Sequence, residues 1–150
     1  QIQEIRLAND KLITELLSDF GMSRAKARPV PMDTSWKSIK KTDGVPLPAG
    51  NRYRELLGKL LYLANTVRPD ISYPTGVLSR FASSPTDLHM QIGMGVLRYL
   101  VGAKDVALVW KKGASSSTVV GFCDSDFAGA QAIWKSTWGG VFLAGTAAVS

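Results

Sequence analysis

Residues Tyr53 to Val101 read YRELLGKLLYLANTVRPDISYPTGVLSRFASSPTDLHMQIGMGVLRYLV, and they decide the fold. In three successive segments of this stretch, apolar residues recur at steps of three and four, which places them on one face of a helix. An apolar helical face has to be buried, and the other two segments are the nearest partners. We therefore predict three helices packed on one another, with buried stripes formed by Leu56, Leu57, Leu60, Leu61 and Ala64, by Val77, Leu78 and Phe81, and by Leu88, Ile92, Val96, Leu97 and Leu100.

A proline-containing break separates the first two helices. Pro69 lacks a backbone donor and disfavours helical geometry at the preceding residue, so the first helix should end by Val67. We predict that the second helix starts near Ser72, because Pro74 then falls in its first turn, where proline is tolerated.

A second break, at residues 82–87, precedes the third helix. Ser84 is the expected N-cap, and Pro85 would take the first helical position. Asp87 follows Ser84 by three residues, so the pair resembles a capping box with aspartate in place of glutamate.

The flanking segments differ from this helical stretch. Residues 1–7 alternate imperfectly and predict a short strand. Residues 11–20 carry a helical stripe, with Asn9 or Asp10 as the cap and Gly21 as the end. Residues 23–50 hold four of the seven prolines and the basic cluster Lys37, Lys40 and Lys41, and we interpret them as an extended, exposed linker. After Gly102, alternating, β-branched and small apolar residues predict β-hairpins, so the fold class is α+β.

Composition narrows the class of protein and its partners. Hydrophobic residues make up 45% of the 150 residues and charged residues 20%, as in a globular domain. The net charge of +6 favours polyanions, nucleic acid first. A single cysteine excludes an internal disulfide and fits an intracellular, reducing compartment, the cytoplasm or the nucleus. No apolar run is long enough to span a membrane, and a start at Gln1 instead of Met favours a fragment.

Two carboxylates are the sharpest chemical feature. Asp124 and Asp126 follow the apolar strand candidate at residues 118–122. Alternate residues of a strand point the same way, and carboxylates at a strand end can hold Mg²⁺. A polar turn is the more common role of such a pair, so both interpretations stay open.

The remaining candidates point to structural roles. One histidine, His89, makes no metal site, and we expect it to be packed or at the surface. Cys123 is expected to be a buried strand residue and not a nucleophile, because no histidine lies near it in sequence. Tryptophans can stack bases but more often anchor a core or an interface; the candidates are Trp36, Trp110, Trp134 and Trp138.

Several short motifs occur in one order along nearly the whole chain. They are Leu16-Leu17, Phe20-Gly21-Met22, Pro31-Met32-Asp33, Tyr53 to Leu63, Arg68-Pro69-Asp70-Ile71, Val77 to Phe81, Val96 to Leu100, Gly121 to Gly129 and Lys135-Ser136-Thr137. Each motif alone is weakly specific. In this order and spacing, however, they resemble the polyprotein of copia-type LTR retrotransposons.

The resemblance implies a division of the chain. Residues 1–22 would be the end of the reverse transcriptase palm and the start of its thumb, and residues 23–50 the extended linker. Residues 51–104 would be the helical thumb region, and residues 105–150 the N-terminal strands of a truncated ribonuclease H-like domain. The thumb of this family grips the template-primer duplex, so the implied partners are an RNA–DNA or DNA duplex and the rest of the Pol polyprotein. The basic residues assigned to the duplex are Arg54, Lys59, Arg68, Arg80 and Arg98.

The resemblance also bears on catalysis. It implies that Asp124 is the remnant first catalytic carboxylate of ribonuclease H and a metal ligand, with Asp126 as a further ligand candidate. The full-length family enzyme uses Mg²⁺, but we expect none for this chain alone. The family's polymerase aspartates lie upstream of this region and the later ribonuclease H carboxylates downstream. The chain thus resembles part of an RNA-directed DNA polymerase and ribonuclease H without the complete active sites.

Two other functions remain open. One is a domesticated, non-catalytic interaction protein, such as a secreted effector, because Arg54-Glu55-Leu56-Leu57 comes close to the RxLR motif of oomycete effectors. The other is a self-contained metal nuclease. The absence of any acidic residue after Asp126 argues against that nuclease.

Overall fold

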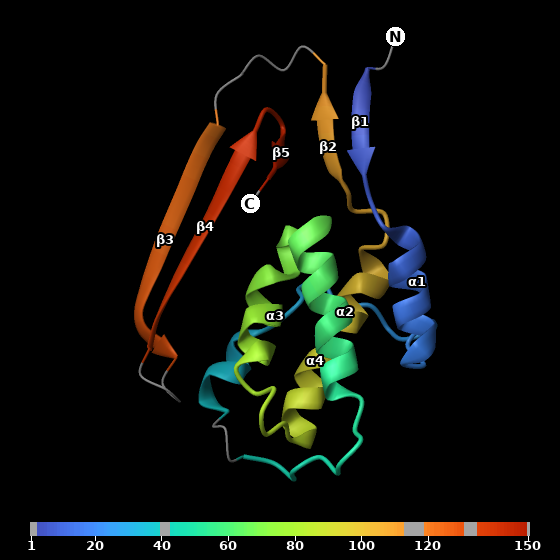
Figure 1. The fold of residues 1–150 in the computed structure, drawn as a ribbon, viewed down its shortest axis with the longest axis vertical. Helices are drawn as coiled ribbons and strands as arrows, with labels where there is room; N and C mark the ends of the chain where they lie inside the picture. Colours follow the sequence, from blue (N-terminus) through green and yellow to red (C-terminus); the bar gives the residue numbers. More distant parts are fainter. Residues whose placement is uncertain (1–2, 40–42, 113–118, 131–134, 150) are drawn as a thin grey trace.

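The computed structural model describes residues 3–39, 43–112, 119–130 and 135–149, and it has the expected α+β fold. Four α-helices form one body, and antiparallel strands stand above and beside it (Figure 1). The helices are α1 (Asp10–Asp19), α2 (Tyr53–Thr66), α3 (Ser72–Ser79) and α4 (Asp87–Gly102). Short 3₁₀ helices, η1 (Thr34–Ser38) and η2 (Pro69–Ile71), lie before α2 and α3.

The predicted cap of α1 and the predicted break between α2 and α3 are confirmed. The side chain of Asn9 accepts a hydrogen bond from the Leu12 N–H at 3.2 Å and caps α1. Helix α2 ends at Thr66, before Arg68, as the restriction on the residue preceding proline requires. Helix α3 starts at Ser72, so Pro74 lies in its first turn.

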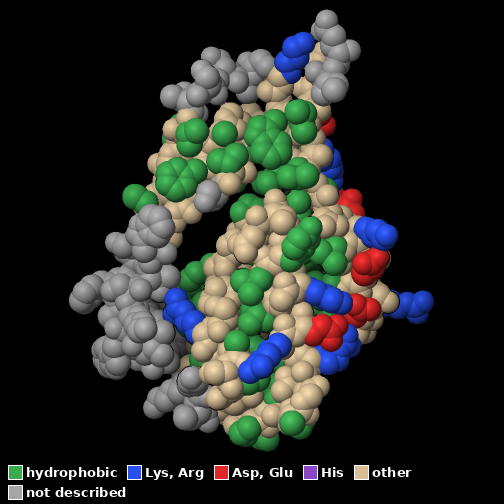
Figure 2. All heavy atoms as spheres, viewed as in Figure 1, with side chains coloured by type: hydrophobic (Ala, Val, Ile, Leu, Met, Phe, Trp, Pro, Cys, Tyr) green, Lys and Arg blue, Asp and Glu red, His purple; other side chains and the backbone are tan. Residues whose placement is uncertain are grey.

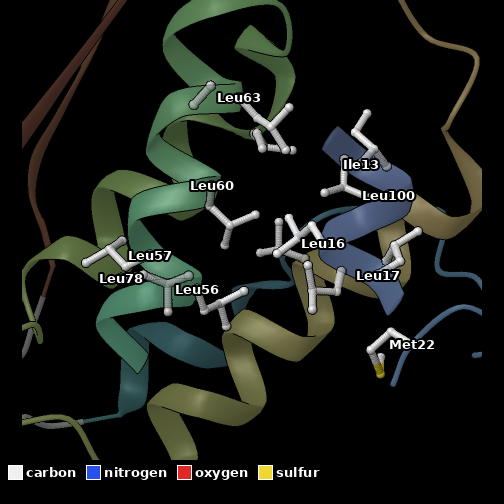
Figure 3. Close-up of a cluster of buried hydrophobic side chains, with 14 of the residues drawn as sticks. Ile13, Leu16, Leu17, Met22, Leu56, Leu57, Leu60, Leu63, Leu78 and Leu100 are labelled. Carbon is white, nitrogen blue, oxygen red and sulfur yellow. The ribbon is translucent and has the colours of Figure 1, made fainter. Parts of the chain in front are cut away.

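The core lies between α1, α2 and α4. Figure 3 shows that the side chains of Ile13, Leu16 and Leu17 point from α1 toward Leu60 of α2 and Leu100 of α4. Each of these five residues is at most 1% exposed. The predicted stripe of α2 is wrong at Leu61, which is 36% exposed, because the buried arc follows Leu56, Leu60 and Leu63 at steps of four and three.

The predicted start of α4 is also wrong. Thr86, in extended conformation, is the N-cap, and its backbone N–H donates to Nδ1 of His89 at 3.0 Å in a capping box. The cause is not local in sequence, because the backbone of Pro85 and Thr86 pairs with residues 45–47 and cannot enter the helix. Asp87 binds that segment instead, since its carboxylate accepts the Val45 N–H at 2.7 Å.

Residues 23–39 and 43–50 are docked on the helical body, although most of their described side chains are exposed. We call residues 23–39 the strap. The strap donates the Arg28 N–H to the Arg98 carbonyl of α4 at 3.2 Å. Its Trp36 is only 6% exposed and packs with Val77 and Phe81 of the α3 region. The expectation of an exposed linker is therefore wrong at Trp36. Its ring packs against residues about 40 positions later in the chain, and the hydrophobic pattern of residues 23–50 does not predict this contact.

A two-stranded sheet joins the two ends of the helical part. Strand β1 (Glu4–Leu7) pairs antiparallel with β2 (Leu108–Lys111), with Glu4 opposite Lys111. The predicted strand near the N-terminus is confirmed. The expectation that β2 belongs to C-terminal hairpins is wrong, because β2 pairs with β1. Alternating apolar residues predict that a segment is a strand, but they do not predict which strand it pairs with.

The C-terminal strands form an antiparallel ribbon of β3 (Val119–Ala130), β4 (Lys135–Ala144) and β5 (Ala147–Ala148). Figure 1 shows β3 and β4 as a long pair at the side of the helices. The hydroxyl of Thr146, in the turn before β5, accepts the Lys111 N–H at 3.1 Å and donates to the Val109 carbonyl at 2.7 Å. This side chain connects the ribbon to the other sheet.

The described apolar side chains of the ribbon are largely exposed. Val119 is 61% exposed, Phe122 57% and Phe142 42%. Figure 2 shows apolar side chains gathered over the strands in the upper part of the molecule. Cys123 is exposed as well, so the expectation that it is buried is wrong. A strand buries a side chain only where a second layer covers it, and no described element covers Cys123.

Candidate nucleic-acid interface

A row of cations lies on the strap where it crosses α4. Arg24, Lys26 and Arg28 alternate with alanines. Arg24 and Lys26 are exposed, and 32% of the Arg28 side chain is exposed. Ala25 packs against the core, whereas Ala27 is exposed like the cations on either side of it, Lys26 and, in part, Arg28. We call Arg24, Lys26, Arg28 and the neighbouring Arg98 the basic strip.

Arg28 is held in place from two sides. Its Nη2 donates to Oδ2 of Asp33 at 2.6 Å. Hydrogen bonds from Ser35 and Arg28 lower the pKa of Asp33 to about 2, so this carboxylate is charged at neutral pH. On the other side, a Cβ on Gly95 would lie 2.7 Å from Nη1 of Arg28. Glycine at that position of α4 therefore gives the guanidinium its space.

Arg98 is the one residue assigned from the sequence that joins this strip. It lies on α4, its side chain is exposed, and its backbone carbonyl is the acceptor that fixes Arg28. Arg98 and Arg28 line the same hollow of about 390 Å³ between the strap and α4. The sequence signal for the rest of the strip was the alternation Arg-Ala-Lys-Ala-Arg at residues 24–28, which the assignment from the family motifs passed over.

Arg54 and Arg80 lie at other hollows. Arg54, on α2, donates from Nε to the Ala82 carbonyl at 3.3 Å and lines a hollow of about 740 Å³ against residues 46–51 and 83–86. Arg80 follows α3 and lines a hollow of about 510 Å³ with Tyr73 and with Gly139 and Gly140 of β4. The structure thus does not bring Arg54, Arg80 and Arg98 into one row.

Arg68 is buried and structural. Its side chain is 0% exposed, and it makes a two-pronged ion pair with Asp70, at 2.9 Å from Nε and 2.7 Å from Nη2. Its Nη1 donates to the Ala103 carbonyl at 2.8 Å, and the Tyr99 hydroxyl donates to Asp70 at 2.7 Å. These contacts join the α2–α3 connection to the end of α4. A side chain so enclosed has no donor to offer a phosphate, and we leave Arg68 out of the interface.

Lys59 is already neutralised by carboxylates. It forms ion pairs with Asp19 of α1 and with Glu55 of its own helix, the latter at 3.4 Å. The hydrogen bond to Asp19 is the main cause of a raised Lys59 pKa, and hydrogen bonds from Arg52 and Lys59 lower the pKa of Glu55 to about 2. This part of the surface therefore mixes both signs, as the helical face in Figure 2 also shows.

His89 is packed and not at the surface. It is 0% exposed, and its ring stacks on Phe81 with a centroid distance of 3.9 Å. Since Nδ1 accepts the Thr86 N–H, the proton of the neutral ring is on Nε2. Burial lowers the pKa of His89, although the charges of Asp43 and Asp87 oppose the shift.

Asp124 lies within β3 and not after a strand. The ladder runs in register from Val119 to Asp126, with Asp124 opposite Gly139 and Asp126 opposite Thr137. The expected strand end before Cys123 is therefore wrong, because β4 supplies partners for these backbone groups. Asp124 is exposed, while the Asp126 side chain lies outside the described part. Within the described residues, no three His, Cys, Asp or Glu side chains are grouped to hold a metal ion.

Trp134 and the side chain of Trp138 lie outside the described residues, and Trp110 lies in β2, half-buried. In the described part of the chain, no helix combines the length and the apolar character needed to cross a membrane.

No protein-family model and no solved structure matches the chain. Several curated proteins are similar to it in sequence. A Ty5-1 transposon protein of Saccharomyces cerevisiae is 32% identical over 147 residues, which cover 98% of this chain and 47% of that protein. The retrovirus-related Pol polyprotein from transposon RE2 of Arabidopsis thaliana is 37% identical over 143 residues, 95% of this chain and 10% of the polyprotein.

A shorter match has a different description. Secreted RxLR effector protein 161 of Plasmopara viticola is 38% identical over 90 residues, which cover 60% of this chain and 63% of that protein. The chain therefore spans less than two thirds of each relative named here, and only about a tenth of the plant polyprotein. Over nearly its whole length, the chain is homologous to the Pol polyproteins of retrotransposons.

Proposed function

We propose that this chain is the part of a retrotransposon Pol polyprotein that runs from the reverse transcriptase thumb into ribonuclease H, and that its helical body contacts an RNA–DNA or DNA duplex. In this proposal the chain works inside the cell with the rest of the polyprotein and catalyses nothing alone. Asp124, with Asp126 beside it in sequence, is the remnant carboxylate of a Mg²⁺ site that needs further ligands from elsewhere.

The observation that carries the proposal is the basic strip. Arg24 and Lys26 are exposed and form no ion pair with any other described residue. Arg98 adds a third accessible cation, next to Arg28, whose backbone N–H donates to the Arg98 carbonyl. Elsewhere on the helical body, Lys59 and Arg52 are matched with carboxylates. Accessible cations in a row suit a phosphate backbone, which is read through charge and not through base sequence.

Salt-dependent binding tests the proposal. A labelled, blunt RNA–DNA hybrid is titrated with the protein at several salt concentrations, and the slope of log K against log salt gives the number of phosphate contacts. Binding should be independent of base sequence and weaken steeply between low and moderate salt. The variant Arg24→Gln/Lys26→Gln/Arg98→Gln should lower the magnitude of the slope by about 2–3.

A matched control separates the strip from net charge. The variant Arg6→Gln/Lys11→Gln/Lys111→Gln removes the same number of positive charges from β1, α1 and β2. Its salt slope should stay close to that of the unchanged protein. Equal losses in both variants would show that overall charge, and not the strip, attracts the duplex.

A second candidate function rests on the match to the secreted effector protein. That match favours a domesticated interaction protein that needs neither duplex contact nor catalysis. The same titration distinguishes the two candidates, because the interaction protein predicts no duplex binding at low salt. Hybrid cleavage with Mg²⁺ or Mn²⁺ that disappears in Asp124→Asn would instead support a nuclease.

A further inference from the structure

The hollow between the strap and α4 differs in character from the basic strip beside it. Its volume is about 390 Å³, near the lower end of the range for small-ligand sites. Such a space is too small for a duplex and of the order of one small organic unit. Its lining combines the two arginines of the strip with polar and apolar groups, among them Met32, Asp33, Ser35, Gln91, Ile92 and Met94.

The charged groups of this hollow favour an anionic group. Arg28 and Arg98 contribute two positive charges and Asp33 one negative charge. Asp33 is bound to Arg28 and to the Ser35 N–H, the latter at 2.9 Å, so its carboxylate orients the guanidinium. Arg98 is exposed and has no carboxylate partner among the described residues. A phosphate placed here meets one fixed and one movable guanidinium, and guanidinium groups bind phosphate with two parallel hydrogen bonds.

The remaining lining favours a flat, mainly apolar group attached to that anion. Met32, Ile92 and Met94 are half-buried and supply adaptable apolar contact, while the guanidinium plane of Arg28 can stack on a ring. Gln91 is exposed on α4, and its side-chain amide offers one acceptor and two donors to the edge of such a ring. A nucleotide has this combination of phosphate, planar base and hydrogen-bonding edge.

We propose that this hollow holds one unpaired nucleotide of the nucleic acid that the basic strip contacts. The phosphate lies at Arg28 and Arg98, and the base enters between the strap and α4 toward Met94 and Gln91. This inference rests on the proposed function and makes it more specific, because it gives the helical body a preference for a duplex with a single-stranded extension.

The test compares two RNA–DNA hybrids of identical paired sequence, one blunt and one with a four-nucleotide extension, with each strand extended in turn. At equal salt, one of the extended hybrids should bind about fivefold or more tightly than the blunt one, the effect of one well-packed base. Gln91→Glu keeps the side-chain shape but replaces the amide donors at the edge of the base by a negatively charged carboxylate, so it should remove the preference for the extension. Gln3→Glu, an exposed glutamine before β1, is the control with the same charge change and should retain the preference.

A second measurement does not depend on the hybrid. Adenosine monophosphate should shift the NMR signals of the Gln91 side-chain amide, and inorganic phosphate alone should not. Equal affinity for blunt and extended hybrids would overturn the inference and leave the proposed function standing. Absence of binding to either hybrid at low salt would overturn both. A shift of the Gln91 amide by inorganic phosphate alone would reduce the hollow to an anion site and overturn the assignment of a nucleotide.

Discussion

The helical body buries its apolar side chains, whereas the β3–β4 ribbon exposes large apolar side chains to solvent. In the helices, Leu16, Leu60 and Leu97 are 0% exposed, whereas Val119 and Phe122 of the ribbon are 61% and 57% exposed. In the helical body, α1, α2 and α4 cover one another, but the described part of the ribbon forms one layer. An apolar side chain stabilises a fold only where a second surface removes it from water. We therefore expect the free energy of unfolding to reside in the helices.

Arg68→Met should have the largest effect. The change leaves the Asp70 carboxylate without its ion pair and the Ala103 carbonyl without a donor, and breaking a buried pair costs about 3–5 kcal/mol. Urea unfolding followed by helical circular dichroism measures this loss. Arg68→Met/Asp70→Asn should recover part of it, because no unpaired charge remains. A change within the error of the measurement would show that the pair contributes nothing to the helical body.

Leu60→Ala probes the core directly. Leu60 is 0% exposed between α1, α2 and α4, so the cavity should cost about 2–5 kcal/mol. Leu61→Ala on the same helix is the control, since Leu61 is 36% exposed and should lose much less. Similar urea midpoints for the two variants would contradict the assignment of the buried face.

The third prediction concerns pH and the start of α4. Burial lowers the pKa of His89 below its ordinary value of 6.5, so the unfolded chain binds the proton more readily than the folded one. Stability from this group is fully present above pH 6.5 and is lost as the pH falls through the lower folded pKa. The free energy of unfolding should therefore decrease from pH 7 toward pH 5.

His89→Phe is the control for this prediction, because phenylalanine keeps the stack on Phe81 and cannot titrate. The variant should show a flatter pH profile above pH 5. Paired carboxylates act in a separate window, because the pKa of Asp70 is itself lowered below 3.8 and Asp70 loses its contribution only in stronger acid. A profile that stays unchanged in His89→Phe would assign the pH dependence to other groups.

The smallest effect is expected in the ribbon. Phe122→Ala removes an aromatic ring that is 57% exposed, so the free energy of unfolding of the helical body should change by less than about 0.5 kcal/mol. Binding of a dye for exposed apolar surface should decrease in the same variant. A loss comparable with that of Leu60→Ala would mean that the ribbon is covered in solution, and the comparison with the helices would fail.

Local patterns in the sequence were sufficient for the helices but not for their connections. The steps of three and four placed α2, α3 and α4, and Pro69 correctly predicted the end of α2. The sequence predicts Ser84 as the cap of α4 and not Thr86, because the contact that decides it, between residues 45–47 and 85–87, is remote in sequence. Pairing of β1 with β2 was missed for the same reason.

The candidate site shows a similar division. Of two arginines that were both assigned to the duplex, Arg98 is exposed and Arg68 is buried, so the assignment of Arg68 is wrong and that of Arg98 stays a prediction. The sequence did contain a signal that Arg68 forms an ion pair, because Asp70 follows it by two residues, with Pro69 between them. The basic strip could not be predicted from the sequence. Arg24, Lys26 and Arg28 come near Arg98 only because the strap is hydrogen-bonded to α4.

The pairing of β1 with β2 also has a consequence for the order of events during synthesis. The two strands are about 100 residues apart in sequence, so β1 has to wait on the order of 5–20 seconds after leaving the ribosome before β2 exists. The helices between them can collapse within that time, which shortens the distance that the strands have to close. We expect pulsed hydrogen exchange during refolding to protect the amides of α2 before those of β1. Protection of β1 first would show that its partner at this stage is a different segment.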